Sequence, residues 1–210
     1  MNTHQEDLNN YIEFIKKSNL HNIEYIVEVG SLDGNDSLFF KEVFPSANVY
    51  AIEGLPDNYN KFLKNKTTIK TYNLVITDHI GETDYYIKNI NGIHGIYDRG
   101  IEYGDQKIKL PCITLDKFCE ENNIPKIDVL KIDVEGATYD VLMGMTNILP
   151  NVSIMHIETE THEFFKNQKL HNEVENFLIN SGFELLYTLK TEITPQKYQC
   201  DTIWINQKIT

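Results

Sequence analysis

Residues 25–40 read YIVEVGSLDGNDSLFF, and this stretch decides the fold class. The apolar run YIVEV stops at Gly30, small polar residues follow, and apolar residues return at Leu38. A strand, a glycine turn and a helix start are typical of an open α/β sheet, in which ligands bind beyond the carboxyl ends of the strands. We therefore expect residues 31–35 to lie in a ligand crevice. Free helix N–H groups from about Asn35 would suit a carboxylate or a phosphate there.

The glycines of this turn do not have the spacing of a dinucleotide-binding motif. Gly30 and Gly34 are four residues apart, and Leu32 stands where GxGxxG has its middle glycine. Glycine allows a close approach to a ligand and positive φ angles, but a tight pyrophosphate approach needs that middle glycine. A ligand that carries a carboxylate needs less space and fits this turn better.

Apolar strand-like runs alternate with helical patterns through the rest of the chain. This alternation predicts an α/β fold with a mostly parallel sheet that is covered by helices on both faces. The strand-like runs are residues 25–29, 48–53, 71–76, 127–133, 152–158, 183–189 and 201–206, and the helical patterns are about 35–44, 56–65, 115–122, 136–146 and 171–181.

Three segments depart from this alternation. A helix over residues 7–19 has one apolar face, and we expect it to pack at the sheet edge as part of an N-terminal addition of residues 1–22. Residues 80–113 contain no helical pattern, which predicts a β-hairpin or loop insertion after the third strand. The last two strand-like runs are too close for a parallel crossover, so the final strand should be antiparallel. The simplest organisation is a single domain over residues 1–210.

Composition limits the classes of function. A chain of 210 residues with 41% hydrophobic residues is long enough to bury a core. The net charge of −12 argues against a general affinity for nucleic acid.

No apolar run approaches the roughly 20 residues that cross a bilayer. The polar start MNTHQEDLNN lacks a signal-peptide pattern, so a cytoplasmic location is the default expectation. The 3 cysteines lack CxxC spacing and are expected to be buried free thiols.

Acids stand at or near the ends of the first three strands. Glu28 precedes Gly30, and Glu53 ends the second strand, where an acid can accept both hydroxyls of a ribose. Asp78 follows the third strand and could contact the edge of an adenine ring. The alternatives are a buried Glu28 satisfied by backbone amides, a Glu53 that caps a loop, and a turn-forming Asp78 before Gly81.

The segment KIDVLKIDVEGATYDVL (126–142) places a lysine inside a central strand. Side chains alternate along a strand, so Lys131 and Asp133 share one face. A buried lysine is costly unless it is paired, and we expect Lys131 to pair with a neighbouring acid. The acids that crowd the carboxyl ends of this strand and the next are Asp133, Glu135, Glu158 and Glu160.

Crowded carboxylates have three uses. They can hold a divalent cation such as Mg²⁺, for which Asp133 and Glu158 are the expected ligands. One of them can be the general base for a substrate hydroxyl, or they can orient polar substrate groups. A structural ion-pair network is the alternative. His94, near glycines in the insertion, could close over the ligand and supply a base, or it could be an exposed loop histidine.

These motifs resemble the FkbM family of S-adenosylmethionine-dependent methyltransferases. Three stretches carry the resemblance, which runs from about residue 24 to about residue 189: VEVGSLDGNDS (27–37), YAIEGLPDNYNKF (50–62) and LKIDVEGATYDVLMG (130–144). The resemblance implies a class I methyltransferase fold, Rossmann-like, with seven strands and an antiparallel last strand. It also implies that Gly30 and its neighbours hold the methionine end of the cofactor. Glu53 would hold the ribose, Asp78 would lie near the adenine, and Asp133 would face the transferred methyl group. The expected cofactor-binding residues are Glu28, Gly30, Ser31, Asp33, Asn35, Ser37, Glu53, Asp78 and Asp133.

The chain departs from the family pattern at two places in the first motif. The family often has Asn where this chain has Leu32, and Asp36 places a negative charge near the methionine carboxylate.

The function implied by the resemblance is methyl transfer to oxygen, commonly to a hydroxyl of a sugar or glycan, or of a natural product. Asp133, Glu158 and His94 are the expected catalytic residues. A small molecule or glycan is the expected partner, and the Ile-, Asn- and Lys-rich composition favours a bacterial surface polysaccharide or a nucleotide-linked sugar. Two alternatives remain: a methyltransferase-like module that binds without catalysis, and a nicotinamide-dependent oxidoreductase. The glycine spacing and the antiparallel last strand count against the oxidoreductase.

Overall fold

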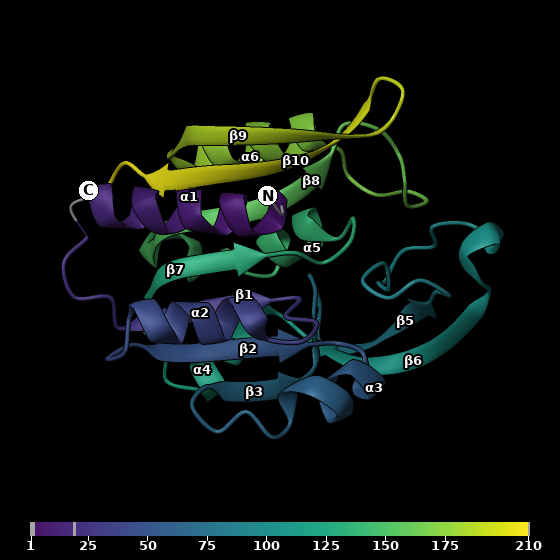
Figure 1. The fold of residues 1–210 in the computed structure, drawn as a ribbon, viewed down its shortest axis with the longest axis horizontal. Helices are drawn as coiled ribbons and strands as arrows, with labels where there is room; N and C mark the ends of the chain where they lie inside the picture. Colours follow the sequence, from purple (N-terminus) through teal and green to yellow (C-terminus); the bar gives the residue numbers. More distant parts are fainter. Residues whose placement is uncertain (1–2, 19, 210) are drawn as a thin grey trace.

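The computed structural model of the chain describes residues 3–18 and 20–209 (Figure 1). Its longer helices are α1 (Thr3–Lys17), α2 (Asn35–Val43), α4 (Leu115–Glu121), α5 (Thr138–Met143) and α6 (His171–Ser181). Short helical turns are α3 (Pro56–Asn58), η1 (Tyr59–Leu63), η2 (Ile101–Tyr103) and η3 (Leu149–Asn151). The strands are β1 (Tyr25–Val29), β2 (Asn48–Glu53), β3 (Lys70–Asn73), β4 (Val75–Ile76), β5 (Gly81–Ile87), β6 (Gln106–Ile113), β7 (Ile127–Ile132), β8 (Val152–Glu160), β9 (Phe183–Thr194) and β10 (Lys197–Asn206).

A seven-stranded sheet forms the centre of the molecule, in the order β3-β2-β1-β7-β8-β10-β9. The pairs from β3 to β8 are parallel, and β10 is antiparallel to both β8 and β9. The prediction of an antiparallel last strand is confirmed. The strand order reverses at β1 and β7, which makes their carboxyl ends the ligand crevice of an open α/β sheet.

Helices cover both faces of this sheet, as the alternation predicted. On one face α4, α5 and α6 pack against the sheet through residues such as Phe118, Leu142 and Leu178. On the other face α1, α2 and η1 pack against it through Tyr11, Phe40 and Leu63. All residues of β7 and β8 are buried, because these strands are sandwiched between two helical layers.

The N-terminal helix lies in a different place from the one expected. α1 does not pack at the sheet edge but lies over the inner part of one face, between β10 and β7 in the view of Figure 1. The hydroxyl of Tyr11 donates to the carbonyl oxygens of Leu130 on β7, at 2.8 Å, and Ile154 on β8, at 3.2 Å. The reason is that the apolar residues of α1 meet Val129, Ile154 and Ile203 on the adjacent strands β7, β8 and β10.

The insertion forms a second, smaller sheet with the order β4-β6-β5. The expected strand 71–76 is divided between the two sheets. β3 pairs with β2 as far as Asn73, and after Leu74 the chain continues as β4, which pairs with β6. The amide of Asn73 donates to the carbonyls of Glu53 and Gly54, which fixes this branch point beside the pocket described below.

Two further features concern expectations from composition. The three cysteines are free and buried, as predicted. Among the described residues, no helix has both the length and the apolar character needed to span a bilayer.

Candidate active site

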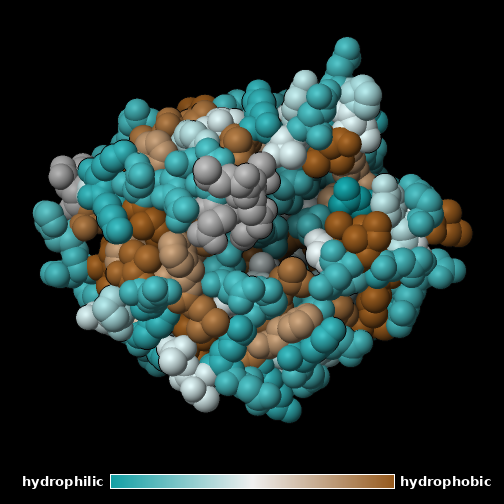
Figure 2. Space-filling view, in the orientation of Figure 1, coloured by the Kyte–Doolittle hydropathy of each residue, from teal (hydrophilic) through white to brown (hydrophobic). Residues whose placement is uncertain are grey.

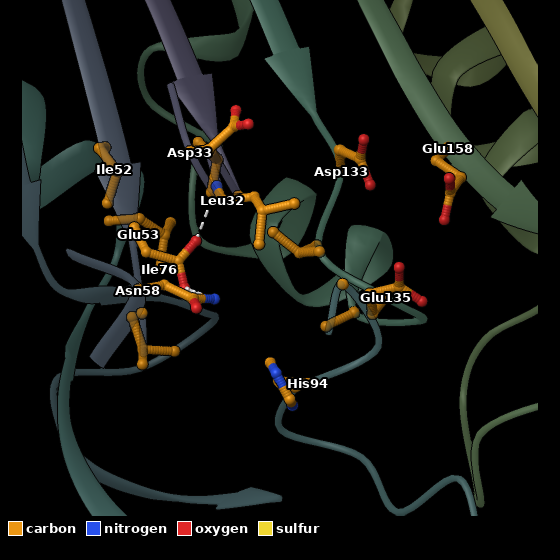
Figure 3. A pocket seen from close by; sticks show the side chains of 18 of the residues that line it. Leu32, Asp33, Ile52, Glu53, Asn58, Ile76, His94, Asp133, Glu135 and Glu158 are labelled. Carbon is orange, nitrogen blue, oxygen red and sulfur yellow. Dashed lines mark hydrogen bonds between the residues drawn. The ribbon is translucent and has the colours of Figure 1, made fainter. Parts of the chain in front are cut away.

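A pocket of about 550 Å³ opens at the carboxyl ends of β1, β2, β7 and β8. Figure 2 shows the molecular surface hollowed between the main sheet and the insertion. A close view places Glu53 and Asn58 at one side of the pocket and Asp133, Glu135 and Glu158 at the other (Figure 3). The residues predicted from sequence that line it are Gly30, Asp33, Asn35, Glu53, His94, Asp133 and Glu158.

Glu53 is held in place by the backbone around it. One carboxylate oxygen accepts the N–H of Leu32 and the other accepts the N–H of Leu55, both at 2.9 Å. The amide of Asn58 lies 3.5 Å from the second oxygen. Burial raises the pKa of Glu53 to about 6, and the two backbone hydrogen bonds limit the rise. Each carboxylate oxygen accepts only one backbone N–H group, and the contact from Asn58 is long, so the group can still accept ligand hydroxyls.

The turn after β1 requires Gly30 for a reason that the sequence did not reveal. Gly30 has φ +86°, and an added Cβ would lie 1.7 Å from the carbonyl oxygen of Asp133. The glycine therefore permits β1 to approach the end of β7, in addition to shaping the ligand crevice. Leu32 has φ 47°, a left-handed conformation that asparagine adopts more readily than leucine.

Lys131 is buried and surrounded by acids on three elements. Its Nζ lies 2.9 Å from Asp133, 3.1 Å from Asp36 and 3.8 Å from Glu28. Burial lowers the pKa of Lys131, but these carboxylates outweigh burial and raise it well above its usual value. The predicted pairing of Lys131 is therefore present, and the negative charge of Asp36 near the methionine position is compensated.

Three predicted cofactor-binding residues lie beneath the pocket and do not line it. Glu28 is 2% exposed and accepts a very short hydrogen bond from the hydroxyl of Ser37. Ser31 is also buried, and its hydroxyl lies 3.3 Å from the Glu28 carbonyl oxygen. Burial raises the pKa of Glu28 to about 7, although Lys131 opposes the shift. The buried side chains of Glu28, Ser31 and Ser37 thus stabilise the turn after β1 rather than contact the pocket.

Asp78 also lies outside the pocket lining. Its carboxylate contacts the His79 ring at 2.7 Å and the Thr77 hydroxyl at 3.3 Å. Asp33 and Asn35 do line the pocket, and Asp33 accepts hydrogen bonds from the backbone and side-chain nitrogens of Asn35 at 3.0 and 2.7 Å. The carboxylate of Asp33 thus fixes the start of α2.

Three carboxylates converge at the far side of the pocket. Asp133, Glu135 and Glu158 each offer an oxygen, and these oxygens all lie within 4.8 Å of one another. Burial and then the charge of Asp133 raise the pKa values of Glu135 and Glu158 well above their usual range. Glu158 accepts a hydrogen bond from the Gln199 amide at 2.5 Å. This cluster can take a proton from a ligand or hold a cation.

His94 lines the pocket, but its lone pair is already used. Its Nδ1 accepts the backbone N–H of Lys88 at 2.9 Å, so in the neutral ring the proton is on Nε2. Nε2 lies 3.3 Å from the Asn91 side-chain oxygen. Burial lowers the pKa of His94, which favours the neutral ring. In this arrangement His94 can donate a hydrogen bond, and the role of base predicted from sequence has no support in its geometry.

The structure adds three residues to the site that were not predicted from the sequence. Leu8 of α1 and Asn58 of α3 line the pocket, as does Glu135, which the sequence had already placed among the crowded carboxylates. Arg99 of the insertion stands beside Glu135, with Nη1 to Oε2 at 3.5 Å. The one feature of the sequence that could have pointed to Arg99 is its rarity, because it is the single arginine in a chain whose other basic residues of this kind are lysines.

The pocket fits S-adenosylmethionine, the cofactor implied by the resemblance. Its volume is in the range of small-molecule sites. The anchored carboxylate of Glu53 matches a ribose diol, and Leu74, Val75 and Ile76 provide apolar surface next to it. The acids at the other end suit the sulfonium and ammonium charges of this molecule.

Solved structures with similar folds define the class of protein. A putative tRNA (m1A22) methyltransferase of Streptococcus pneumoniae, in complex with S-adenosyl-L-methionine, matches 96% of this chain and 72% of its own with a TM-score of 0.53 and 13% identity. Magnesium protoporphyrin IX methyltransferase of Synechocystis PCC 6803 with bound SAH matches 97% of this chain and 84% of its own, with a TM-score of 0.53 and 11% identity. The fold is that of a class I methyltransferase.

Residues 28–185 match the methyltransferase FkbM domain, and the chain belongs to this family. Two curated relatives are similar to it. Hexuronic acid methyltransferase AglP of Haloferax volcanii is 30% identical over 118 residues, which are 53% of this chain and 47% of the relative. The 2-O-methyltransferase NoeI of Sinorhizobium fredii is 24% identical over 160 residues, which are 68% of this chain and 66% of the relative. The chain thus spans about half of AglP and just under two thirds of NoeI.

Proposed function

We propose that this protein is an S-adenosylmethionine-dependent O-methyltransferase that acts on a hydroxyl of a sugar or glycan. The observation that carries the proposal is one pocket with an anchored ribose acceptor, Glu53, at one end and three converging carboxylates at the other. Membership of the FkbM family supports the reaction. The names of AglP and NoeI support a saccharide acceptor, because one acts on a hexuronic acid and the other is a 2-O-methyltransferase.

The residues around Glu53 would bind the donor. Glu53 accepts the ribose hydroxyls, and the apolar residues Leu74, Val75 and Ile76 receive the adenine. The turn from Gly30 to Asn35 faces the methionine end. The donor has a net positive charge, and the acids that line the pocket favour it over the demethylated product, which lacks the sulfonium charge.

The acids at the other end would handle the acceptor. When bound, the donor supplies an activated methyl group, so the protein mainly positions the acceptor hydroxyl and removes its proton. Glu158 and Glu135 are stronger bases than ordinary carboxylates because their pKa values are raised by burial and by Asp133. We assign the base to Glu158 and the orienting role to Asp133, which Lys131 holds at 2.9 Å.

A divalent cation is the second possibility for the same three acids. Asp133, Glu135 and Glu158 present oxygen ligands, which Mg²⁺ prefers. A cation there would lower the pKa of an acceptor hydroxyl, so that the proton could pass to water and no carboxylate would be needed as base. Methyl transfer that is lost after chelation and returns with Mg²⁺ supports the cation. Methyl transfer that survives chelation indicates that a carboxylate accepts the proton of the acceptor hydroxyl.

The experiment that tests the function has two steps. Calorimetry with S-adenosylmethionine and with its demethylated product should show saturable binding of both. Transfer of a labelled methyl group to a panel of glycans should then identify acceptors. Absence of binding to either cofactor form would refute the proposal, and binding without transfer to any acceptor would favour the non-catalytic alternative.

A further inference from the structure

Arg99 is the single arginine of the chain, and it stands beside Glu135, one of the carboxylates that line the pocket. All other basic residues among the 19 Lys and Arg are lysines. Its Nη1 is 3.5 Å from Glu135, which lines the pocket together with Asp133 and Glu158. The guanidinium therefore stands one side chain away from the carboxylates that converge on the expected acceptor hydroxyl.

Aromatic rings hold the guanidinium by its faces. Its Cζ lies 4.9 Å from the ring centre of Phe165, 5.3 Å from Tyr103 and 5.9 Å from Phe164. These rings come from the insertion and from the segment between β8 and α6. Contacts of a guanidinium with aromatic rings do not use its N–H groups, which can therefore bind other groups.

The N–H groups of Arg99 are mostly unused by the protein. Within the described part of the chain, its one hydrogen bond or ion pair is the long 3.5 Å contact to Glu135, and its charge also acts on Glu160, where it opposes the rise in pKa that burial causes. A guanidinium has five N–H donors in a fixed planar fork. The side chain is 16% exposed, so the fork is shielded on its faces yet open to a ligand.

The backbone on both sides of Arg99 is fixed by a buried lysine. Lys88 Nζ contacts the Asp98 carboxylate at 2.5 Å and the carbonyls of Gly100 at 3.3 Å and Gly104 at 2.9 Å. The N–H of Lys166 donates to the Asp98 carbonyl at 2.8 Å, which joins this loop to the segment before α6. A fork that is held in place before binding loses little entropy when a ligand arrives.

We propose that Arg99 binds an anionic group of the acceptor sugar, a carboxylate or a phosphate, and so selects acidic saccharides. This inference rests on the proposed function. Arginine suits this task because its fork pairs with two oxygens at once, whereas a lysine offers a single point charge. The anion at Arg99 and the hydroxyl at Asp133 would then fix the sugar at two points.

A simpler reading makes Arg99 a clamp between the insertion and the segment before α6. The two readings differ in what a conservative substitution changes. Arg99→Lys keeps the positive charge and much of the packing but loses the fork. If Arg99 binds the acceptor, this variant loses affinity for acidic sugars and keeps its affinity for neutral sugars and for the cofactor.

The test uses calorimetry and labelled-methyl transfer on the full chain saturated with the demethylated cofactor or supplied with the donor. The probes are methyl glucuronoside, glucose 1-phosphate and methyl glucoside. We expect the wild-type protein to bind an acidic probe about tenfold or more tightly than the glucoside, and Arg99→Lys to remove about that factor. If Arg99→Lys weakens the binding of methyl glucuronoside, the anionic group of the acceptor is a carboxylate. If it weakens the binding of glucose 1-phosphate, the group is a phosphate. Lys109→Gln, which removes an exposed charge paired with Asp84, is the matched control.

The outcomes separate this inference from the proposed function. Cofactor binding without a preference for either acidic probe overturns the role of Arg99 and leaves the methyltransferase proposal intact. If Arg99→Lys weakens the binding of acidic and neutral probes equally, Arg99 acts as a clamp between the insertion and the segment before α6. A protein that binds no cofactor refutes the proposed function itself.

Discussion

At the scale of single residues, the site depends on how each carboxylate is surrounded. Glu53 accepts two backbone N–H groups and remains available to a ribose. Glu28 is enclosed with Ser37 and Lys131 and has no surface on the pocket. Both acids follow similar sequence patterns, but their contacts give one of them a binding surface and the other a supporting position.

Replacing Glu53 should weaken cofactor binding and leave the fold intact. Glu53→Ala removes the acceptor of the ribose hydroxyls, and loss of such hydrogen bonds costs about 1–3 kcal/mol. The dissociation constants for S-adenosylmethionine can be compared by calorimetry. Glu42→Ala, an exposed acid on α2, is the control and should bind normally. An unchanged dissociation constant in Glu53→Ala would remove Glu53 from the site.

Cofactor binding should also depend on pH through the same residue. The pKa of Glu53 is raised to about 6, so its carboxylate gains a proton as the pH falls through that value and then accepts fewer hydroxyls. Affinity should therefore decrease from pH 7 to pH 5. In Glu53→Gln the step near pH 6 should disappear, and a step of the same size in that variant would assign the titration to another group.

At the scale of elements, the turn after β1 joins two strands and the pocket. Gly30 allows β1 to approach β7, and the carbonyl oxygen of Ile52 on β2 accepts the N–H groups of Gly30 and Ser31. Three neighbouring strands are thus fixed at the point where the ligand crevice opens. The insertion and the segment before α6 close the other side through the contacts of Arg99 and Asp98.

Substitution of Gly30 should destabilise the protein more than loss of glycine elsewhere. Gly30→Ala combines a strained φ of +86° with a Cβ 1.7 Å from the Asp133 carbonyl oxygen. Backbone strain alone costs about 1–3 kcal/mol. Gly92→Ala is a matched control, because Gly92 has φ +90° but open space around its Cα. Thermal unfolding should show a larger decrease in melting temperature for Gly30→Ala than for Gly92→Ala. Equal decreases would mean that the close approach of β1 to β7 adds nothing to the destabilisation.

At the scale of the whole molecule, the fold concentrates acids at one edge of the sheet. The chain has a net charge of −12, and several carboxylates are buried in or near the pocket. Burial raises the pKa values of Glu28 and Glu160 to about 7 and of Asp201 to about 6. The native protein therefore keeps protons that the unfolded chain releases.

These buried acids with raised pKa values predict how the stability of the fold changes with pH. A carboxyl group whose folded pKa is raised stabilises the fold fully below its unfolded pKa, about 4.5 for glutamate, and this stability is lost as the pH rises through the folded value. The melting temperature of the free protein should accordingly fall between pH 6 and pH 8. Glu28→Gln should flatten the decline. A melting temperature that rises over this interval would contradict the assigned shifts.

Much of the architecture was predictable because it depends on local patterns. The parallel strands, the antiparallel last strand and the insertion follow from alternation, spacing and the absence of a helix between residues 189 and 201. The family motifs predicted that Glu53 and Asp133 lie in the site, and both residues line the pocket. The position of α1 was mispredicted, because an amphipathic pattern shows that a helix packs but not against which strands.

The sequence by itself determined an α/β fold with a mostly parallel sheet and the acids at the strand ends, since periodicity is encoded along the chain, and its motifs carried the resemblance to the FkbM family that implied the class I methyltransferase fold. Only the tertiary structure decided which acids reach the pocket, that the lone pair of His94 is occupied, and that Arg99 meets Glu135. The physical reason is that burial, hydrogen bonding and charge pairing are set by residues distant in sequence. Arg99 and Glu135 are separated by two strands, the helix α4 and the helical turn η2, and nothing in the order of the residues states that they touch.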